Sequence, residues 1–481
     1  MTIPFLTGLD ESYGPTGGDA SSAPFAYNIR TDYGQFAPAR GYQKYIEKAL
    51  PADATRAYLF ADRNQGQEMQ FILIGTPSSI LVWRDDEWQA LYSNAQGGDW
   101  GFVTYQNGEE VLLLAGNGVD PLLYWDGVSA TAQEVEGAPC TGNQFCVHFE
   151  RVFCAGDPAH PDRVFYSRAF APFDWSGDTD HPENGGGFVD IPTWDGGKIT
   201  SILSDGQDVL VGKTTSVFRL YGTTPADFTI MPVSGSMGIT APMSHALSGV
   251  THYYVSEFGV ATYYGGNFSL MDDRKLPRIF DEQYVTPEED IHLWSGFGGC
   301  CAAVADSQQR VLFALPLGPD ATENNAVLEY DVARQLFLLR RGFNVVSWMK
   351  AGNARTQILF LGRRGQESFV YAYEKGNDLD GEPQPYHWET PWMDLTAKYA
   401  RKRVCSVRLF GSMPDGGAVR LSIETDRCRR ERILSAQRLR GGSLRFATNA
   451  PGERFRFLLD SVDGATFSFS AGLELEVELD E

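Results

Sequence analysis

The sequence lacks any run of about 18 apolar residues, so it offers no candidate for a transmembrane helix. Its opening stretch, MTIPFLTGLDESYG, has no basic residue and no long apolar core, and a secretory signal is therefore not expected. Cysteines are few and irregularly spaced. Because their number is odd, we expect free thiols in a reducing compartment rather than a disulfide framework. The seven cysteines are at positions 140, 146, 154, 300, 301, 405 and 428.

The common signatures of nucleotide and acyl chemistry are also missing. There is no GxxxxGK[ST] phosphate loop, no GxSxG elbow and no S-x-D-x-G-x-x-W box. The one glycine-rich phrase, GNGVDP at 116–121, falls in a predicted hairpin turn and not before a helix. Composition and motifs thus provide no cofactor site, and we expect none.

Basic residues are in the minority, with 40 Lys and Arg against 62 Asp and Glu, for a net charge of −22. A protein that binds nucleic acid by neutralising phosphates should be basic, so this mode is not expected for the whole chain. The imbalance is uneven, since residues 386–481 hold 15 basic and 14 acidic groups and the first 385 residues hold 25 and 48. The turn-rich phrase GNDLDGEPQPYHWETPW, from position 376, marks this change as a domain boundary.

Turn formers and aromatic residues are abundant. The 51 Gly and 25 Pro make up about 16% of the chain, and aromatics make up 13%. This combination favours many short strands joined by turns and argues against a helical bundle. Helical periodicity is nearly absent, and residues 45–50 and 287–293 are expected to form at most short helical turns.

The middle of the chain repeats a loose unit of two to four apolar runs separated by Gly, Asn or Asp. The phrases VLLLAGN…LLYWDG, VLVGK…VFRLYG and ILFLGRR…VYAYEKG show the shared pattern. A hairpin cannot bury both of its faces alone, whereas radially stacked units of about 35–50 residues can, as in a β-propeller. Seven units are expected, at 58–92, 100–135, 145–175, 199–233, 243–270, 293–339 and 345–374.

Two alternatives to this seven-bladed arrangement stay open. Six blades are possible because residues 176–197 read either as a long loop or as part of a blade. A pair of β-sandwiches would also fit an all-β pattern.

The last 96 residues read differently. VCSVRLFG, AVRLSIETD, ERFRFLLDS and TFSFSAGLELEVELD alternate apolar with polar residues, which predicts a small antiparallel β-sandwich. Its outward positions are rich in arginine. They form either a docking surface for an acidic neighbour or a solvated face paired with Glu424, Asp426 and Glu431. The basic residues are Arg401, Lys402, Arg403, Arg408, Arg420, Arg427, Arg429, Arg430, Arg432, Arg438 and Arg440.

The first 24 residues are rich in Gly, Ser and Pro and predict an extended arm. Two short strands are expected after it, around the turn at 32–34. The expected organisation is therefore an arm and hairpin at 1–50, a β-propeller at 51–385 and a sandwich at 386–481.

Four groups of residues are candidates for chemical sites. Cys140, Cys146, His148 and Cys154 have no familiar zinc spacing, and buried thiols with one satisfied histidine are favoured. Cys300 and Cys301 are adjacent, so they point to opposite faces of a strand. Whether a calcium ion binds among Asp178, Asp180, Glu183 and Asp190 is left open, because the spacing matches no EF loop. Asp157, His160 and His181 lie in loops without a visible nucleophile partner. No catalytic or metal residue is therefore assigned.

Several long phrases resemble one protein family. The opening GLDESYGPTGGDASSAPFAYNIRTDYGQFAPARGYQKY is similar to the start of many bacteriophage tail and connector proteins. The phrases RVFYSRAFAPFDWS, KITSILSDGQDVLVGKTTSVFRLYG and GSMGITAPMSHALSGVTHYYVSEFGVATYYGGN resemble the propeller of podovirus tail nozzle, or tail hub, proteins. WETPWMDLTAKYARKRVCSVRLFG and the strands after it resemble their C-terminal β-domain. The resemblance covers about 90% of the chain in order. The large inserted tip domains of the biggest nozzle proteins are missing, which leaves a distal nozzle and a more proximal connector both open.

The resemblance implies a structural virion protein and not an enzyme. Such proteins form a ring, commonly of six copies, which attaches to the portal, adaptor and other tail proteins and conducts the genome during ejection. The implied location is the phage tail, after assembly in the host cytoplasm. Viral DNA would pass through the lumen without tight binding, in keeping with an acidic lining. The expected contact residues between subunits or partners are Tyr27, Arg30, Arg40, Tyr42, Arg401, Arg403, Arg427 and Arg430.

Two other functions remain open. A propeller enzyme that hydrolyses glycans would need two carboxylates about 5–9 Å apart, one with a raised pKa. A receptor-binding tail protein would show clustered exposed aromatics, for example at Trp83 and Trp88 or at Trp125.

Overall fold

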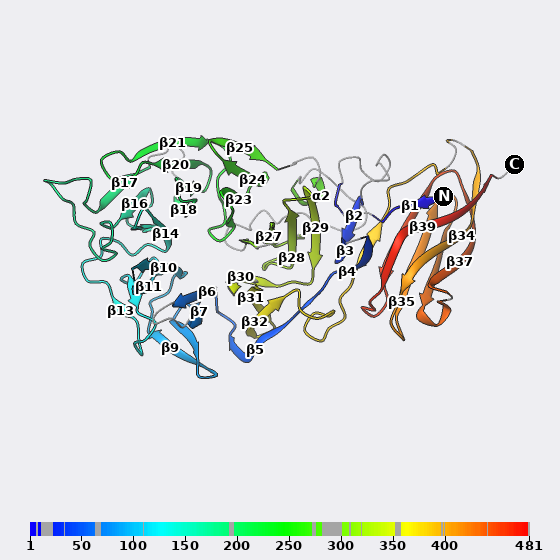
Figure 1. Ribbon diagram of the computed structural model, residues 1–481, viewed down its shortest axis with the longest axis horizontal. Coiled ribbons are helices and arrows are strands. Elements are labelled where there is room, and N and C mark those ends of the chain that lie inside the picture. Colours follow the sequence, from blue (N-terminus) through cyan, green and yellow to red (C-terminus); the bar gives the residue numbers. More distant parts are fainter. Residues whose placement is uncertain are drawn as a thin grey trace.

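The computed structural model describes residues 1–5, 8–10, 23–32, 34–62, 69–108, 110–191, 197–271, 276–280, 301–306, 309–318, 320–351, 357–395, 398, 400–439 and 441–479. Most of the expected arm (11–22), the expected helical turn at 287–293, Cys300 and Arg440 lie outside these residues. In the described part, the protein is an all-β molecule, with a ring of blades at one end and a β-sandwich at the other (Figure 1).

The ring is a β-propeller, and seven four-stranded blades are found within the described residues. The first three blades each use strands that follow one another in the chain. Blade 1 contains β6 (Arg56–Asp62), β7 (Met69–Thr76), β8 (Ser79–Arg84) and β9 (Glu87–Ser93). Blade 2 contains β10 (Gly101–Asn107), β11 (Glu110–Gly116), β12 (Leu123–Trp125) and β13 (Gln133–Glu134). Blade 3 contains β14 (Gln144–His148), β15 (Arg151–Ala155), β16 (Arg163–Tyr166) and β17 (Gly187–Asp190).

The next three blades follow the same rule. Blade 4 contains β18 (Ile199–Ser204), β19 (Val209–Lys213), β20 (Val217–Tyr221) and β21 (Thr229–Ser234). Blade 5 contains β22 (His245–Ser248), β23 (Thr251–Ser256), β24 (Gly259–Tyr264) and β25 (Asn267–Leu270). Blade 6 contains β26 (Ala302–Ala305), β27 (Arg310–Leu315), β28 (Ala326–Asp331) and β29 (Leu336–Arg341).

The hydrophobic cores lie between neighbouring blades, because each blade is apolar on both faces. One buried cluster joins each successive pair around the ring. Between blades 1 and 2, for example, Phe60, Phe71 and Leu73 pack against Trp100 and Trp125. The cluster between blades 7 and 1 closes the circle, so the prediction of seven blades is confirmed and six is excluded. The region 176–197 is both loop and blade, since its residues 187–190 form the outer strand β17.

The last blade corrects one sequence prediction. Blade 7 consists of β30 (Val345–Ala351), β31 (Gln357–Arg364), β32 (Glu367–Tyr373) and, as its outer strand, β5 (Tyr42–Pro51). Residues 45–50, expected as a short helical turn, are thus a strand that pairs with β32. Ile46 and Leu50 are four residues apart, a spacing that a helix face and a strand face share, and both point to the core because alternate residues of a strand lie on the same side.

The sandwich is confirmed, and it uses strands from both ends of the chain. Its pairs are antiparallel. One sheet contains β3 (Ile29–Asp32), β4 (Gln35–Pro38), β39 (Ser468–Leu479), β34 (Lys402–Ser412), β37 (Ser443–Gly452) and, beside β39, β1 (Thr2–Ile3). The other contains β2 (Phe25–Tyr27), β33 (His387–Glu389), β38 (Phe455–Ser461), β35 (Ala418–Thr425) and β36 (Arg429–Ser435). Residues 1–50, expected as one arm with a hairpin, are therefore divided between sandwich and propeller. The hairpin itself is present as β3 and β4.

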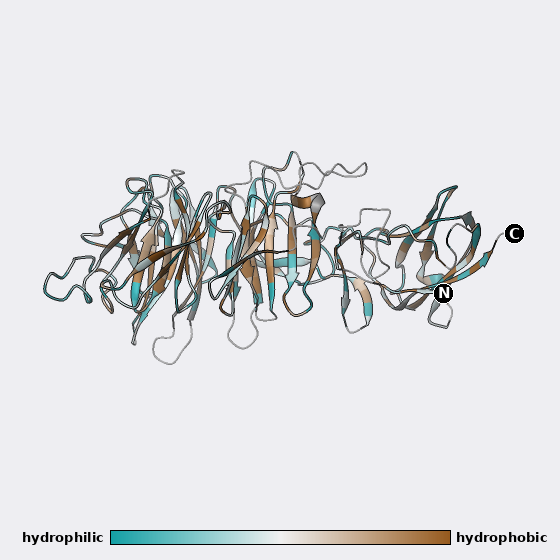
Figure 2. Ribbon diagram, turned by 90° about the horizontal axis from the view of Figure 1, so that it is seen from above, coloured by the Kyte–Doolittle hydropathy of each residue, from teal (hydrophilic) through white to brown (hydrophobic). Residues whose placement is uncertain are grey.

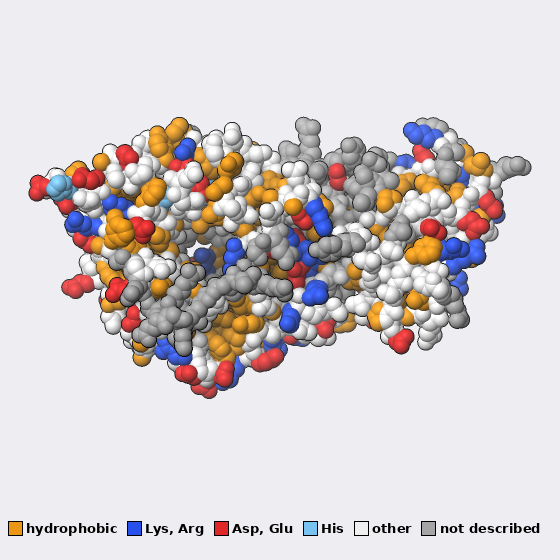
Figure 3. Space-filling model, viewed as in Figure 1, with side chains coloured by type: hydrophobic (Ala, Val, Ile, Leu, Met, Phe, Trp, Pro, Cys, Tyr) orange, Lys and Arg blue, Asp and Glu red, His pale blue; other side chains and the backbone are white. Residues whose placement is uncertain are grey.

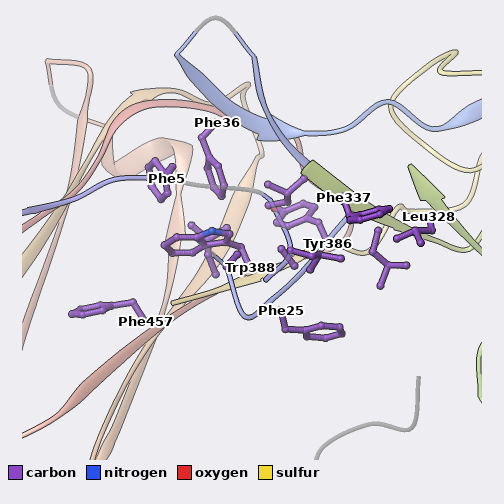
Figure 4. Close-up of a cluster of buried hydrophobic side chains, with 14 of the residues drawn as sticks. Phe5, Phe25, Phe36, Leu328, Phe337, Tyr386, Trp388 and Phe457 are labelled. Carbon is purple, nitrogen blue, oxygen red and sulfur yellow. The ribbon is translucent and has the colours of Figure 1, made fainter. Parts of the chain in front are cut away.

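Propeller and sandwich share a sheet and a core. Blade 6 continues through β29 into β2 and on to β36, as one nine-stranded sheet. The seam between β29 and β2 is short, with Tyr27 opposite Leu339. Aromatic side chains pack around it in a single buried cluster, in which Trp388 lies edge-on to Phe5 and Phe36 (Figure 4). The blades stand side by side in Figure 2, with the sandwich extending beyond them.

Regular helix is scarce in the part described: it consists of α2 (Pro277–Phe280) and the 3-10 turn η2 (Ala436–Arg438). Neither these nor any other described helix is long and apolar enough to cross a membrane.

Candidate functional site

The outermost strand of the sandwich, β36, has an unusual exposure pattern. Residues 429–433 are all exposed, so both faces of this edge strand meet solvent, and Ile433 is 49% exposed. Arg429 pairs with Glu424 at 2.9 Å, whereas Arg430 makes no hydrogen bond or ion pair with any described residue. The Arg432 guanidinium lies 5.8 Å from the centre of the Phe446 ring. An edge strand of this kind presents unpaired backbone groups beside positive charge.

The expected contact residues divide into two sets. Arg40, Arg401, Arg427 and Arg430 are exposed. Arg427 lies 3.6 Å from Asp426 and 3.8 Å from Glu453, weak surface pairs that leave it accessible. Arg403 is half-buried and donates from Nη1 to Asn449 Oδ1 at 3.2 Å. Five exposed arginines of the sandwich are hereafter called the basic edge. They are Arg401, Arg427, Arg429, Arg430 and Arg432.

The other set lies inside the subunit. Tyr27 stacks on His387, with ring centroids 5.7 Å apart, and has the Arg341 guanidinium over its ring. Tyr42 begins β5 and packs edge-on against Phe343, Phe360 and Tyr371. Sequence reasoning could not separate these residues from exposed ones, because an aromatic or Arg in a short strand has the same local pattern in either setting.

Arg30 belongs to a buried ion cluster between the sandwich and the propeller. Its guanidinium bonds to Glu329 in blade 6 and to Glu374 at the end of blade 7. Arg310 binds the same two carboxylates at 3.1 and 3.0 Å. Burial alone would raise the pKa of Glu374, but Arg30 and Arg310 lower it to about 2. Arg30 therefore attaches β3 to the propeller.

A second charged group, His387, lies at the seam between propeller and sandwich. It sits in β33, opposite Tyr27 on one side and Asp460 on the other. Its Nδ1 is 2.7 Å from Asp460 and its Nε2 is 3.6 Å from Glu389. Burial alone would lower the pKa of His387, but these two carboxylates raise it to about 9. At neutral pH the seam thus contains an imidazolium between two acids.

Charge differs between the two ends of the molecule. The propeller, residues 39–385, holds 24 Lys and Arg against 44 Asp and Glu, a net charge of −20. Figure 3 shows Asp and Glu side chains around the outer rim of the blades and a group of Lys and Arg side chains at the far side of the sandwich. An acidic body and the basic edge therefore occupy opposite ends of one subunit.

The axis of the propeller contains two adjoining cavities. The first, of about 310 Å³, is lined by residues of several blades, among them Arg56 at the start of β6, Asp99 before β10, Asn143 before β14, Glu323 before β28 and Arg363 in β31. The second, of about 220 Å³, shares Arg56 and Asn143 and extends to Ser201 and His245. Figure 3 shows the molecule hollowed near the centre of the ring. Sequence reasoning missed this site, because its residues come from different blades.

The wall of the second cavity begins a chain of polar contacts. Ser201 Oγ lies 2.8 Å from His245 Nδ1, and His245 Nε2 lies 2.9 Å from His252 Nδ1. His252 Nε2 is 3.5 Å from Asp205. A neutral imidazole donates from one nitrogen and accepts at the other, so His245 donates to one of its two neighbours, Ser201 and His252, and accepts from the other. Burial lowers the pKa of both histidines, well below its ordinary value for His245, which keeps them neutral.

The other chemical candidates do not converge. Cys140 and Cys154 touch at 3.5 Å in the core between blades 2 and 3, while Cys146 packs between blades 3 and 4. His148 instead bonds Ser204 at 2.9 Å. No cluster of three metal-ligating side chains occurs among the described residues.

The acidic loop in blade 3 is also engaged by arginines. Asp178 accepts backbone N–H bonds from Asp180 and His181 and lies 3.3 Å from Arg168. Asp190 forms a two-pronged pair with Arg163, at 2.7 and 3.0 Å. Two of the four carboxylates considered as calcium ligands, Asp178 and Asp190, are thus already paired with arginine guanidinium groups.

Two features bear on the alternative functions. Trp83 and Trp88 form an edge-to-face pair 5.0 Å apart and are partly buried, while Trp125 is 1% exposed in the core. Glu323, at the axial cavity, has a lowered pKa: burial would raise it, but bonds from Asn344 and Arg363 outweigh burial. A glycosidase acid requires the opposite shift.

Comparison with known proteins finds solved structures of low similarity. Neither a protein-family model nor a curated protein matches the chain. Among solved structures, the β-propeller domain of Cps50 (Swd1) from Myceliophteria thermophila aligns over 68% of this chain and 99% of its own, at 10% identity and a TM-score of 0.43. The WD40 domain of Neurospora crassa Pan2 aligns over 71% of this chain and 96% of its own, at 12% identity and a TM-score of 0.40.

Proposed function

We propose that the protein is a structural component of a bacteriophage tail, in which copies assemble into a ring that conducts the genome during ejection. The observation that carries this proposal is the separation of charge within one rigid subunit. The basic edge lies at one end, and the propeller with its net charge of −20 lies at the other. Complementary charge steers association and selects the partner surface.

The edge strand β36 supplies a second element of such a contact. Among the described strands it pairs only with β35, and its exposed residues include the apolar Ile433 beside Arg430 and Arg432. Contacts that combine an apolar centre with a charged rim are typical of specific interfaces. The basic edge of one copy therefore docks on the acidic propeller of the next, a head-to-tail contact that produces a closed ring when the rotation closes.

The junction between the propeller and the sandwich holds the two ends of the subunit in a fixed arrangement, which such a head-to-tail contact requires. A continuous nine-stranded sheet, the shared aromatic core and the Arg30 cluster all cross it. A ring built from such subunits keeps a fixed lumen. Its acidic propellers would repel duplex DNA, so that the genome slides through without the drag that phosphate contacts would add.

The test is the mass of the purified protein by native mass spectrometry at low and high salt. We expect a ring-sized oligomer at low salt that dissociates as salt screens the contact. The double variant Arg430→Glu and Arg432→Glu should reduce ring formation at least tenfold. The matched control, Lys375→Glu with Lys398→Glu, makes the same change of charge at exposed positions outside the basic edge and should assemble normally.

Two results would overturn the proposal. One is a stable monomer at all salt concentrations that also fails to join isolated phage tails lacking this component. The other is strong retention of duplex DNA by the oligomer at physiological salt, because a conduit must release the genome. Hydrolysis of a surface glycan, or binding of a receptor through the Trp83–Trp88 pair, would support the alternatives instead.

A further inference from the structure

The axial cavity of the propeller holds a positive charge without a partner. Arg56, the first residue of the innermost strand β6, lines both adjoining cavities. Among the described residues, no hydrogen bond or ion pair reaches its guanidinium. Asp99, which lines the first cavity, acts on Arg56 electrostatically without a hydrogen bond or ion pair between them. Burial lowers the pKa of Arg56, which reflects loss of water around the charge.

Two further donors in the same wall are incompletely satisfied. The Thr55 hydroxyl, next to Arg56, is buried and has no hydrogen-bond partner among the described residues. Arg363 donates a hydrogen bond from Nη1 to Glu323, while its buried Nε has no hydrogen-bond partner among the described residues. Buried polar groups in folded proteins are nearly always hydrogen-bonded, so the buried Thr55 hydroxyl and Arg363 Nε leave donors for a ligand beside the half-buried Arg56.

The shape of the space agrees with a small ligand. The cavity of about 310 Å³ falls within the range typical of small-molecule sites, and the second cavity adds about 220 Å³. Its wall is mixed, with the amides of Asn143 and Gln144 beside Trp100 and Met243. An arginine fork binds a carboxylate or a phosphate through two parallel hydrogen bonds.

We propose that the axial cavity binds a small organic anion whose carboxylate or phosphate is held by Arg56. This inference is independent of the ring proposed above, because the site lies inside one propeller and is built by one chain. The ligand would join strands from several blades at the axis and thereby stabilise the folded propeller.

The test uses the full-length protein in isothermal titration calorimetry and thermal unfolding. The probes are citrate and acetate for carboxylates, and inorganic phosphate and glycerol phosphate for phosphates, with sodium chloride at matched ionic strength. We expect one of the two groups of probes to bind and to raise the unfolding temperature, whereas chloride has no effect. Which group binds identifies the acid chemistry of the ligand.

Three variants decide whether Arg56 is responsible. Arg56→Gln should weaken binding of the active probe at least tenfold and leave the ligand-free unfolding temperature unchanged or raised, because it removes an unpaired charge. Arg56→Lys should weaken binding less, since it keeps the charge and loses the fork. Lys375→Gln, which removes an exposed cation, should bind as the wild type does. Absence of binding by every probe would overturn the proposal. Unchanged binding in Arg56→Gln, or marked loss of ligand-free stability in that variant, would do so as well.

Discussion

Raising the pH should loosen the seam between propeller and sandwich through one residue, His387. The imidazolium lies between Asp460 and Glu389, which raise its pKa to about 9 in the folded protein. In the unfolded chain a histidine has a pKa of about 6.5. Because the folded pKa is the higher one, the stabilisation is fully present below about pH 6.5 and is lost as the pH rises through about 9.

The magnitude follows from these two values. His387 contributes about 2.5 kcal/mol to the free energy of unfolding at pH 7 and close to zero at pH 10. Its side chain is 12% exposed, so solvent screening is small. The measurement is urea unfolding at pH 7 and pH 10, followed by tryptophan fluorescence. Trp388, next to His387 in β33, reports on the seam.

Other groups titrate in the same pH range in both the wild type and the variant His387→Gln. Their contribution cancels when the pH dependence of one protein is subtracted from that of the other. The wild type should lose about 2.5 kcal/mol more than the variant between pH 7 and pH 10. At pH 7 the variant should be less stable, because it loses the ion pairs of His387 with Asp460 and Glu389. If the wild type and the variant show the same dependence on pH, His387 is not the charged group inferred from its contacts.

Three further predictions concern other parts of the molecule. Acid should destabilise the propeller, because burial holds the pKa of His245 well below its ordinary value. The stability that is present above about pH 6.5 is therefore lost as the pH falls. In the variant His245→Gln, the urea midpoint of unfolding should depend less on pH between 7.5 and 5 than it does in the wild type. Arg30→Met should cost about 3 kcal/mol in urea unfolding by leaving Glu329 and Glu374 short of a cation, whereas Arg334→Met, which removes an exposed pair with Asp32, should cost less than about 1 kcal/mol; equal losses would contradict the role of Arg30. Gly41→Ala should lower the thermal midpoint by an amount corresponding to about 2 kcal/mol or more, since a Cβ there would lie 1.7 Å from the Asp378 carbonyl oxygen, while Gly177→Ala, with nothing closer than 3.8 Å, should be nearly neutral.

Local patterns predicted what is local in this fold. The seven units, the hairpin around Asp32 and the alternating strands of the sandwich follow from apolar period and turn residues, and each is found where expected. Strand β5 is not predicted because only Ile46 and Leu50 are buried in it, so its sequence lacks the apolar alternation of a half-buried strand. Its partner lies more than 300 residues away, and no local pattern specifies a pairing over that distance.

The candidate sites also divide into features that a local sequence pattern predicts and features that depend on distant parts of the chain. The richness of the sandwich in arginine could be read from the sequence, and the exposed strand β36 agrees with it. That Arg30 is an internal ion pair and Arg430 a free surface group could not be read, because both stand in short alternating strands. The axial cavity is lined by residues from separate blades, so it exists only once the ring is closed.

The interleaving of the two ends of the chain has a consequence for synthesis. Strands β1 to β4 leave the ribosome first, yet their partners in the sandwich, β33 to β39, are made last. Strand β5 likewise cannot complete its pairing with β32 until residue 373 has emerged, so the propeller cannot close earlier. A chain that stops before residue 367 therefore completes neither domain, and its unpaired strand edges are prone to aggregate. The order of synthesis thus delays closure of the propeller until β32 is made, and completion of the sandwich until β39 is made.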